Sequence, residues 1–196
     1  SRGLGDVYKR QVDSPYYHLH DSACVVGVMK REMSGIDLMC VVDELQSFRD
    51  AWIGKIYQHG EIVRIALSVP GKGRHNLVIE PGKRFHLTEY PKETRFPTSF
   101  AMQLRKHLQG MRLKNIRQHG LDRVVIMEID GKEVIAELFA KGNVVVKEGD
   151  SVIASLRHVQ SYEFPPHIDP RDIGVDELYS LLSSSQVVKT LAVSLG

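Results

Sequence analysis

Short runs of strand-forming residues follow one another from residue 53 to residue 156, and turns rich in glycine or proline separate most of them. Dipeptides such as Asp130-Gly131 and Gly142-Asn143 accept the left-handed backbone that tight hairpins require. Neighbouring runs joined in this way predict hairpins. The stretch as a whole therefore predicts two antiparallel β-meanders.

The first meander is expected to contain four strands, and the breaks between them are marked by glycine or proline; the strands span residues 53–59, 61–69, 76–80 and 84–89. The second meander is expected to contain five shorter strands, at residues 112–118, 122–129, 133–140, 143–147 and 151–156.

Two amphipathic helices are expected beside the strands. Ser34 and Asp37 have the S-x-x-D spacing of a capping box and precede apolar residues at helical intervals, which predicts a helix over residues 36–50. Residues 98–109 show a similar apolar periodicity and stop before Gly110. The fold class is therefore α+β, with the meanders packed as a sandwich or barrel-like core against the two helices.

The composition is that of a globular protein. With 196 residues, 42% of them hydrophobic and 26% charged, the chain can form one sizeable domain and a small appendage. Its two cysteines are too few for a disulfide framework or a zinc site, which favours a reducing compartment, and we expect the cytoplasm. No apolar run reaches the roughly 18 residues needed to cross a bilayer, so no membrane role is expected.

The ends of the chain differ from its centre. Residues 1–32 lack periodicity, and residues 5–11 resemble the translation of a sequencing adaptor, so we interpret 1–32 as a non-native or disordered leader before Met33. We expect the main domain at 33–163 and a proline-containing linker at 164–174. Helical patterns at 175–182 and 186–195 suggest that residues 175–196 begin a further helical module.

Positive charge is concentrated between residues 105 and 123. This run holds six Lys or Arg residues and one acid, whereas the whole chain has a net charge of only +2. Such a cluster is typical of a site for a phosphate-bearing partner, but it is equally typical of a solvated basic surface. The candidate basic patch consists of Arg105, Lys106, Arg112, Lys114 and Arg117, and Arg123 closes the run.

Asp122 and Arg123 form a candidate recognition pair. They follow Gly120, where a turn would present them, and precede an apolar strand that would hold them rigidly. Arginine can bind a phosphate or stack on a base, and a neighbouring carboxylate can orient it or accept from a ribose hydroxyl. The alternative is an ion pair at a strand entrance, worth about 0 to 1 kcal/mol. For Asp37, the residue pattern itself favours helix capping.

The sequence contains no common catalytic signature. We find no G-x-S-x-G, H-E-x-x-H, Walker or G-x-G-x-x-G pattern, and the nine histidines are scattered. Residues 70–74, PGKGR, are better explained as a hairpin turn than as a phosphate-binding loop. We therefore expect no catalytic residue, no metal, no cofactor and no small-molecule substrate.

Several segments, in their order along the chain, carry a resemblance to a known family. They are MSGIDLMCVVDEL from Met33, IGKIYQ from Ile53, RFHLTEYP from Arg84, SFAMQLRKHLQGMRL from Ser99, QHGLDRVVIMEI from Gln118 and ELFAKGNVVV from Glu137. Together they resemble the N-terminal domain of the NFACT family, whose members include RqcH proteins and the eukaryotic factor NEMF. The final segment, SSSQVVKTLAVSLG, is similar to the start of the helix-hairpin-helix module that follows in this family.

The resemblance implies a factor of ribosome-associated quality control. Family members bind a large ribosomal subunit that still carries peptidyl-tRNA, and they recruit an aminoacyl-tRNA, chiefly alanyl-tRNA in prokaryotes, for tailing of the stalled chain without messenger RNA. The family's tRNA-binding Asp-Arg pair corresponds to Asp122 and Arg123, and its early helix aspartate corresponds to Asp37.

The resemblance also leaves other functions to consider. The family's fold is similar to the N-terminal domain of formamidopyrimidine-DNA glycosylases, but residues 33–35, Met-Ser-Gly, lack the N-terminal proline nucleophile of those enzymes. The alternatives are a fibronectin-binding surface adhesin, a role long attached to the family name, and a general nucleic-acid-binding module without catalysis.

Overall fold

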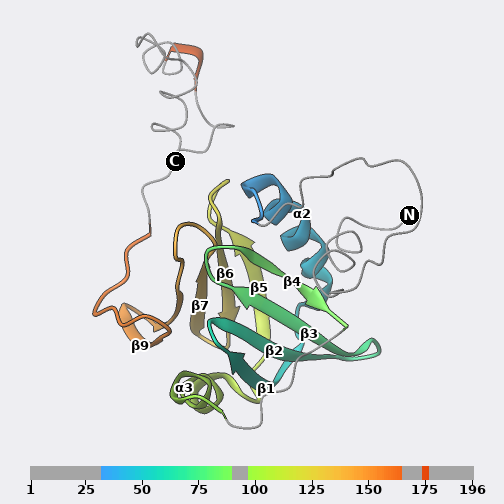
Figure 1. Ribbon diagram of the computed structural model, residues 1–196. Helices are drawn as coiled ribbons and strands as arrows, with labels where there is room; N and C mark the ends of the chain where they lie inside the picture. Colours follow the sequence, from blue (N-terminus) through green and yellow to red (C-terminus); the bar gives the residue numbers. More distant parts are fainter. Residues whose placement is uncertain (1–31, 90–96, 165–173, 177–196) are drawn as a thin grey trace, which may run out of the picture.

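The computed structural model describes residues 32–89, 97–164 and 174–176. Figure 1 shows two antiparallel sheets packed face to face with a helix near each of two opposite corners. The first sheet has the strand order β1-β2-β3-β4 and the second has the order β5-β6-β7-β8-β9, so each is a meander as the turn pattern predicted. The expected α+β fold class is confirmed.

The helical elements are α2 (Gly35–Leu45), the 3-10 helix η1 (Gln46–Phe48) and α3 (Ser99–Leu108). The first sheet consists of β1 (Trp52–His59), β2 (Ile62–Val69), β3 (Gly73–Glu80) and β4 (Arg84–Thr88). The second sheet consists of β5 (Leu113–Gln118), β6 (Val124–Ile129), β7 (Lys132–Glu137), β8 (Val144–Glu148) and β9 (Ser151–Ser155).

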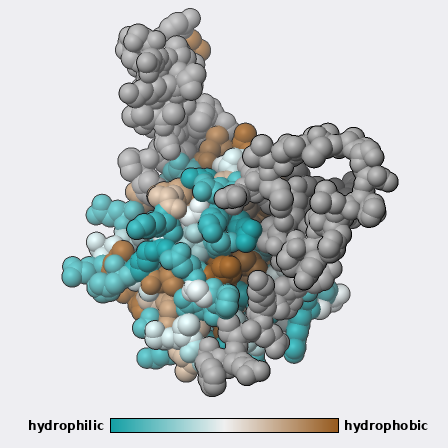
Figure 2. Space-filling view, viewed as in Figure 1, coloured by the Kyte–Doolittle hydropathy of each residue, from teal (hydrophilic) through white to brown (hydrophobic). Residues whose placement is uncertain are grey.

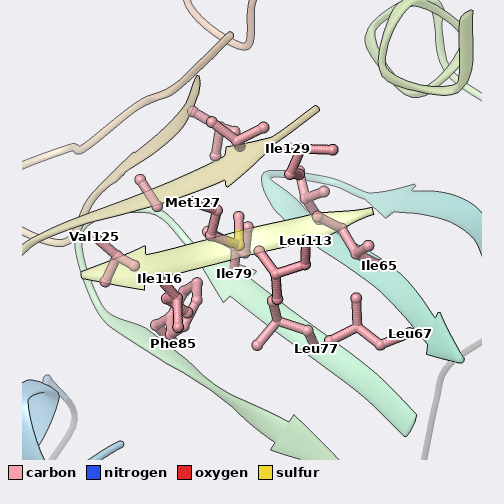
Figure 3. Packing of buried hydrophobic residues seen from close by; sticks show 14 of the residues in the cluster. Ile65, Leu67, Leu77, Ile79, Phe85, Leu113, Ile116, Val125, Met127 and Ile129 are labelled. Atoms are coloured by element: carbon pink, nitrogen blue, oxygen red, sulfur yellow. The ribbon is translucent and has the colours of Figure 1, made fainter. Parts of the chain in front are cut away.

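The core lies between the two sheets. Side chains alternate between the two faces of a strand, so every second residue of each strand can point into this layer. Figure 3 shows apolar side chains of the two sheets meeting there, and all of those it labels belong to one buried cluster: Ile65, Leu67, Leu77, Ile79, Phe85, Leu113, Ile116, Val125, Met127 and Ile129. Burial of this apolar layer is the main force that holds the sheets together.

The two sheets are joined through their backbones at one corner, where β1 and β5 begin. The N–H of Asp50 donates to the carbonyl of Leu113 at 2.7 Å, and the N–H of Leu113 donates to Ala51 at 2.9 Å. A β-bridge between Trp52 and Arg112 continues the contact. The sandwich is therefore partly closed, which gives it the barrel-like character expected from the sequence.

The helices close opposite corners of the sandwich. Helix α2 packs on β4 and β5 through Leu38, Val41, Val42 and Leu45, whereas α3 packs on β1 and β9 (Figure 1). In each helix the apolar residues recur three and four positions apart, so they form one stripe that faces the core.

Part of the outer face of the second sheet is covered by residues 156–164, which we call the C-terminal strap. Tyr162 and Phe164 of the strap pack against Val124 and Ile126, which point away from the main core. Because both faces of β6 are covered, its sequence is apolar almost throughout instead of alternating.

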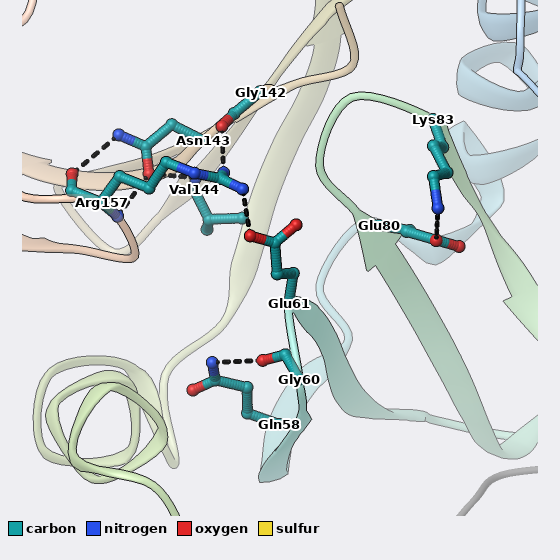
Figure 4. A network of polar contacts seen from close by, with 9 residues as sticks. All are labelled: Gln58, Gly60, Glu61, Glu80, Lys83, Gly142, Asn143, Val144 and Arg157. Atoms are coloured by element: carbon teal, nitrogen blue, oxygen red, sulfur yellow. Dashed lines mark hydrogen bonds and ion pairs between the residues drawn. The ribbon is translucent and has the colours of Figure 1, made fainter. Parts of the chain in front are cut away.

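Arg157 anchors the beginning of the C-terminal strap (Figure 4). Its guanidinium pairs with Glu61 of the β1–β2 turn and donates to the carbonyl of Gly142. The side chain of Asn143 donates to the Arg157 carbonyl and accepts from its N–H, both at 2.9 Å. The strap is thus fixed to both sheets where it leaves β9.

Four element boundaries differ from those expected by two residues or more. Strand β3 begins at Gly73, three residues before the predicted start at residue 76. The first helix ends at Leu45 and is followed only by η1. It does not reach residue 50 as predicted, and Asp50 has φ +63, which no right-handed helix can contain. Strand β6 begins at Val124, since Asp122 lies in a hydrogen-bonded turn. Strand β7 ends at Glu137, before the turn in which Ala140 has φ +50.

The predicted leader 1–32 lies outside the described residues except for Glu32, as do the linker 164–174 apart from its ends and most of the two predicted C-terminal helices. Within the described ranges, no helix is both long and apolar enough to cross a membrane. Figure 2 shows a surface in which hydrophilic side chains predominate and apolar ones are scattered among them.

Candidate nucleic-acid interface

Residues 119–123 form a tight turn between β5 and β6, which we call the Asp122 turn. The N–H of Asp122 donates to the carbonyl of His119 at 3.0 Å, and the N–H of His119 donates to Val124 at 3.0 Å. Gly120 has φ +52 in this turn, a conformation that glycine adopts without strain. The turn therefore presents Asp122 and Arg123 at the end of a rigid hairpin.

Arg123 is partly exposed and keeps donors for a partner. Its Nη1 atom lies 3.0 Å from the Glu32 carboxylate and 3.4 Å from the carbonyl of Met33, and 29% of the side chain is exposed. Among the described residues, its Nε and Nη2 atoms make no hydrogen bond. Asp122 is half-buried beside it. The guanidinium can therefore bind a phosphate through Nε and Nη2 while the contacts of Nη1 keep the group oriented.

Asp37 closes the predicted capping box at the start of α2. Its carboxylate accepts from the Ser34 N–H at 2.7 Å and from the Ser34 hydroxyl at 2.6 Å, while the Asp37 N–H donates to that hydroxyl at 3.3 Å. The capping interpretation is thus confirmed. Whether Asp37 also contacts RNA stays a prediction.

One peptide group links Asp37 to Arg123. The carbonyl of Met33 accepts from Arg123, and the N–H of Ser34, which belongs to the same planar peptide unit, donates to Asp37. The guanidinium and the Asp37 carboxylate are therefore held on opposite edges of one peptide. The structure brings together the three residues that the family resemblance marks for tRNA.

Two residues that sequence reasoning missed hold this arrangement. Gly35 lies so close to the Asp122 turn that a Cβ atom there would be 2.1 Å from the carbonyl oxygen of Leu121. The side chain of Gln118 donates both to the carbonyl of Gly35, at 3.0 Å, and to that of Asp122, at 2.8 Å. A glycine in the first helical turn is a weak sequence signal for such an approach. Gln118 belongs to one of the segments that resemble the family, but nothing local in the sequence indicates its two contacts.

The C-terminal strap supports the turn from its other side. The ring of Phe164 stacks on that of His119 with centroids 5.0 Å apart, and Tyr162 packs edge-on against Phe164. Phe164 is the first residue of the linker predicted from the sequence, and its ring packs on the folded domain.

The residues of the basic patch do not gather at the Asp122 turn. Arg105 and Lys106 lie in the last turn of α3, at the corner opposite α2 (Figure 1). Arg105 donates to the carbonyl of Ile56 at 2.7 Å, and Arg112 covers the ring of Trp52 at 4.3 Å. Strand β5, at about 3.3 Å per residue, separates this corner from the turn by roughly 20 Å.

The two remaining cations of the patch lie along β5 and are paired with acids. Lys114 is 3.4 Å from Asp50 and 3.7 Å from Asp130. Arg117 is 3.3 Å from Glu128 and 3.6 Å from Glu133. The charge that is concentrated along the sequence is thus spread out and partly neutralised in space. The part of the chain that the structure describes contains no group of three His, Cys, Asp or Glu side chains placed to hold a metal ion.

Comparison with known proteins gives a family match over most of the chain. The model described as "NFACT N-terminal and middle domains" matches residues 34–194. The Methanocaldococcus jannaschii protein named "Archaeal Rqc2 homolog aRqcH" is 36% identical, over 70% of this chain and 24% of its own length. The Drosophila melanogaster "Ribosome quality control complex subunit NEMF homolog" is 32% identical, over 83% of this chain and 17% of its own length. The chain thus spans a quarter or less of these relatives.

A solved structure shows the same fold. The crystal structure of the N-terminal domain of the fibronectin-binding protein PavA from Streptococcus pneumoniae superposes with a TM-score of 0.70 and 22% identity, over 83% of this chain and 73% of that one. At this identity the likeness concerns the fold alone.

Proposed function

The chain belongs to the NFACT family, and on that premise we propose that it forms the tRNA-contacting part of a cytoplasmic factor of ribosome-associated quality control. In this role it binds an aminoacyl-tRNA, alanyl-tRNA in the simplest case, and presents it to a large ribosomal subunit that is blocked by peptidyl-tRNA. The stalled chain then receives a tail without messenger RNA.

The arrangement around the Met33–Ser34 peptide carries the proposal. Arg123, Asp122 and Asp37 come from two elements far apart in sequence, yet the contacts of Gly35 and Gln118 hold these elements side by side. A partly exposed guanidinium beside carboxylates suits a tRNA backbone, because the cation can bind a phosphate and a carboxylate oxygen can accept from a ribose hydroxyl. The names of the two relatives also support this role.

The proposed role needs no catalytic group from this chain. Peptide transfer belongs to the ribosome, so the protein has only to bind and orient the tRNA. The protein then needs only contacts that bind the RNA. It does not have to stabilise the charge that develops in a transition state.

The test is tRNA binding by the chain and by a double variant, Asp122→Ala with Arg123→Ala. We expect the dissociation constant for a tRNA transcript, measured by fluorescence anisotropy at fixed salt, to rise at least tenfold, about 1.4 kcal/mol. The melting temperature should change little, because the backbone hydrogen bonds of the turn remain. Co-sedimentation with large ribosomal subunits should fall in parallel.

A matched control removes an acid and a base elsewhere. Lys132 and Glu148 form an ion pair of 2.9 Å at the far end of the second sheet. Replacing both by alanine changes the same charges but should leave tRNA binding within twofold. Equal affinity of the Asp122/Arg123 variant and the wild-type chain would refute the proposal. Equal binding of tRNA and of a plain RNA duplex would instead indicate a general nucleic-acid-binding module.

A further inference from the structure

We propose that Gln118 is a positioning residue of this site, because its side-chain amide fixes the start of α2 against the Asp122 turn and so sets Asp37 relative to Asp122 and Arg123. The inference rests on the proposed tRNA role of these three residues. Gln118 does not contact the RNA in this proposal; it acts through the residues that do.

Gln118 is the last residue of β5, and its Nε2 atom makes one hydrogen bond to each of the two elements. It donates to the carbonyl of Gly35 at 3.0 Å and to that of Asp122 at 2.8 Å. A primary amide has two N–H donors, so both are used. The acceptors lie 83 and 4 residues away along the chain, so the side chain joins a distant helix to its own turn.

Both acceptors are backbone carbonyls, which leaves the side chains of the site available to a partner. The carbonyl of Asp122 also belongs to the peptide unit that connects Asp122 with Arg123. A hydrogen bond to this oxygen restrains the rotation of that planar unit, and the directions of both side chains depend on it. One contact thus orients the whole Asp-Arg pair.

The side-chain oxygen of Gln118 indicates that this residue does more than pack against its neighbours. Its Oε1 atom is buried and accepts no hydrogen bond among the described residues. A buried acceptor without a partner is unfavourable, and an apolar side chain of the same size would avoid that cost. The two bonds from Nε2 are therefore the feature that the glutamine supplies.

The residue that follows α2 provides a matched control. Gln46, the C-cap of α2 and first residue of η1, also donates twice from Nε2, to the carbonyl of Val42 at 3.0 Å and to that of Ile116 at 2.8 Å. It too joins α2 to β5, but it does not contact the Asp122 turn. Removing either glutamine amide therefore loosens the same pair of elements, while only Gln118 affects the site.

The experiment compares Gln118→Met with Gln46→Met in the 196-residue chain. We expect Gln118→Met to weaken binding of a tRNA transcript at least fivefold and to speed hydrogen exchange at the Asp122 N–H at least tenfold. Both variants should lower the melting temperature by a similar amount. Gln46→Met, however, should leave the tRNA dissociation constant within twofold of the wild-type value. In a background of Asp122→Ala with Arg123→Ala, Gln118→Met should weaken tRNA binding by a smaller factor than in the wild-type chain, because most of its effect acts through that pair.

The outcomes separate this inference from the proposed function. If Asp122→Ala with Arg123→Ala abolishes binding while Gln118→Met weakens it no more than Gln46→Met, the positioning role is refuted and the proposed function stands. If the Asp122/Arg123 variant binds tRNA normally, both fail. Should Gln118→Met not fold, Gln118→Asn replaces it: this amide is one methylene shorter and cannot reach both carbonyls, so wild-type affinity would overturn the inference.

Discussion

The absence of one side chain at Gly35 allows the start of α2 to touch the Asp122 turn. Alanine is normally better than glycine in a helix by about 1 kcal/mol. Here an added Cβ would lie 2.1 Å from the Leu121 carbonyl oxygen. This oxygen is a backbone atom, so it can move only if the Asp122 turn itself shifts. The packing of two elements therefore outweighs the helix preference at this residue.

We expect Gly35→Ala to lower the free energy of unfolding by more than about 1 kcal/mol, opposite in sign to the propensity effect. Urea denaturation monitored by circular dichroism measures it. Binding of tRNA should weaken at the same time, because the helix start is pushed from the turn. A more stable variant would show that the two elements separate without cost.

Asp37 has a structural role that can be measured apart from RNA binding. Because its carboxylate accepts two hydrogen bonds from Ser34, Asp37→Ala should cost about 1 kcal/mol of stability. Asp43→Ala, at an exposed position of the same helix, should stay within about 0.5 kcal/mol of wild type. Thermal unfolding of the two variants checks this. Similar melting curves would mean that the capping box contributes little.

At the scale of elements, the C-terminal strap links the second sheet to the Asp122 turn. Its aromatic residues cover the outer face of β6, and Phe164 reaches the turn through its stack on His119. Burial of the Tyr162 hydroxyl, together with the neighbouring Glu137 carboxylate, raises the pKa of Tyr162. The strap is therefore held in place with this tyrosine neutral.

This shift predicts a pH dependence. In the unfolded chain tyrosine loses its proton near pH 10, whereas folded Tyr162 keeps it, so the folded state binds more protons and stability falls as the pH rises above about 10. Tyr162→Phe removes this contribution, and its free energy of unfolding should fall less steeply than that of wild type. Urea titrations between pH 8 and pH 11 compare the two. Parallel curves would show that the hydroxyl is solvated.

At the scale of the whole molecule, the distribution of charge limits how many phosphates the chain can contact at once. Lys114 and Arg117 are paired with acids, and Arg105 and Arg112 are engaged at the corner far from the Asp122 turn. The basic run is therefore not one continuous patch, although Arg123 and the exposed Lys106 remain accessible.

The dependence of tRNA binding on salt should report this arrangement. Six phosphate contacts would give a slope of about 5 in a plot of log affinity against log salt, and we expect about 2 to 3. Lys114→Ala with Arg117→Ala should leave the slope unchanged and the dissociation constant within threefold. A slope near 5 that falls in this variant would show that the acid-paired cations also bind phosphate.

Much of the fold could be predicted because its signals are local. The turn dipeptides, the capping box of Ser34 and Asp37, and the apolar periodicity each involve residues only a few positions apart, and the resulting meanders and helices are those of the structure. The Asp122 turn was also expected, since Gly120 marks it and an apolar strand follows. Element boundaries were less accurate where a positive φ, as at Asp50, ends an otherwise continuous pattern.

The tertiary structure alone decided how the site is assembled. The sequence by itself determined which residues lie in a helix start, a turn or a strand, because these preferences act over a few residues. It could not show that Gln118 reaches a carbonyl 83 residues away, that Gly35 meets Leu121, or that Glu128 and Glu133 neutralise Arg117. Such contacts depend on how the two sheets and α2 pack in space. Packing brings together residues that are far apart along the chain, and no local sequence pattern predicts which of them will meet.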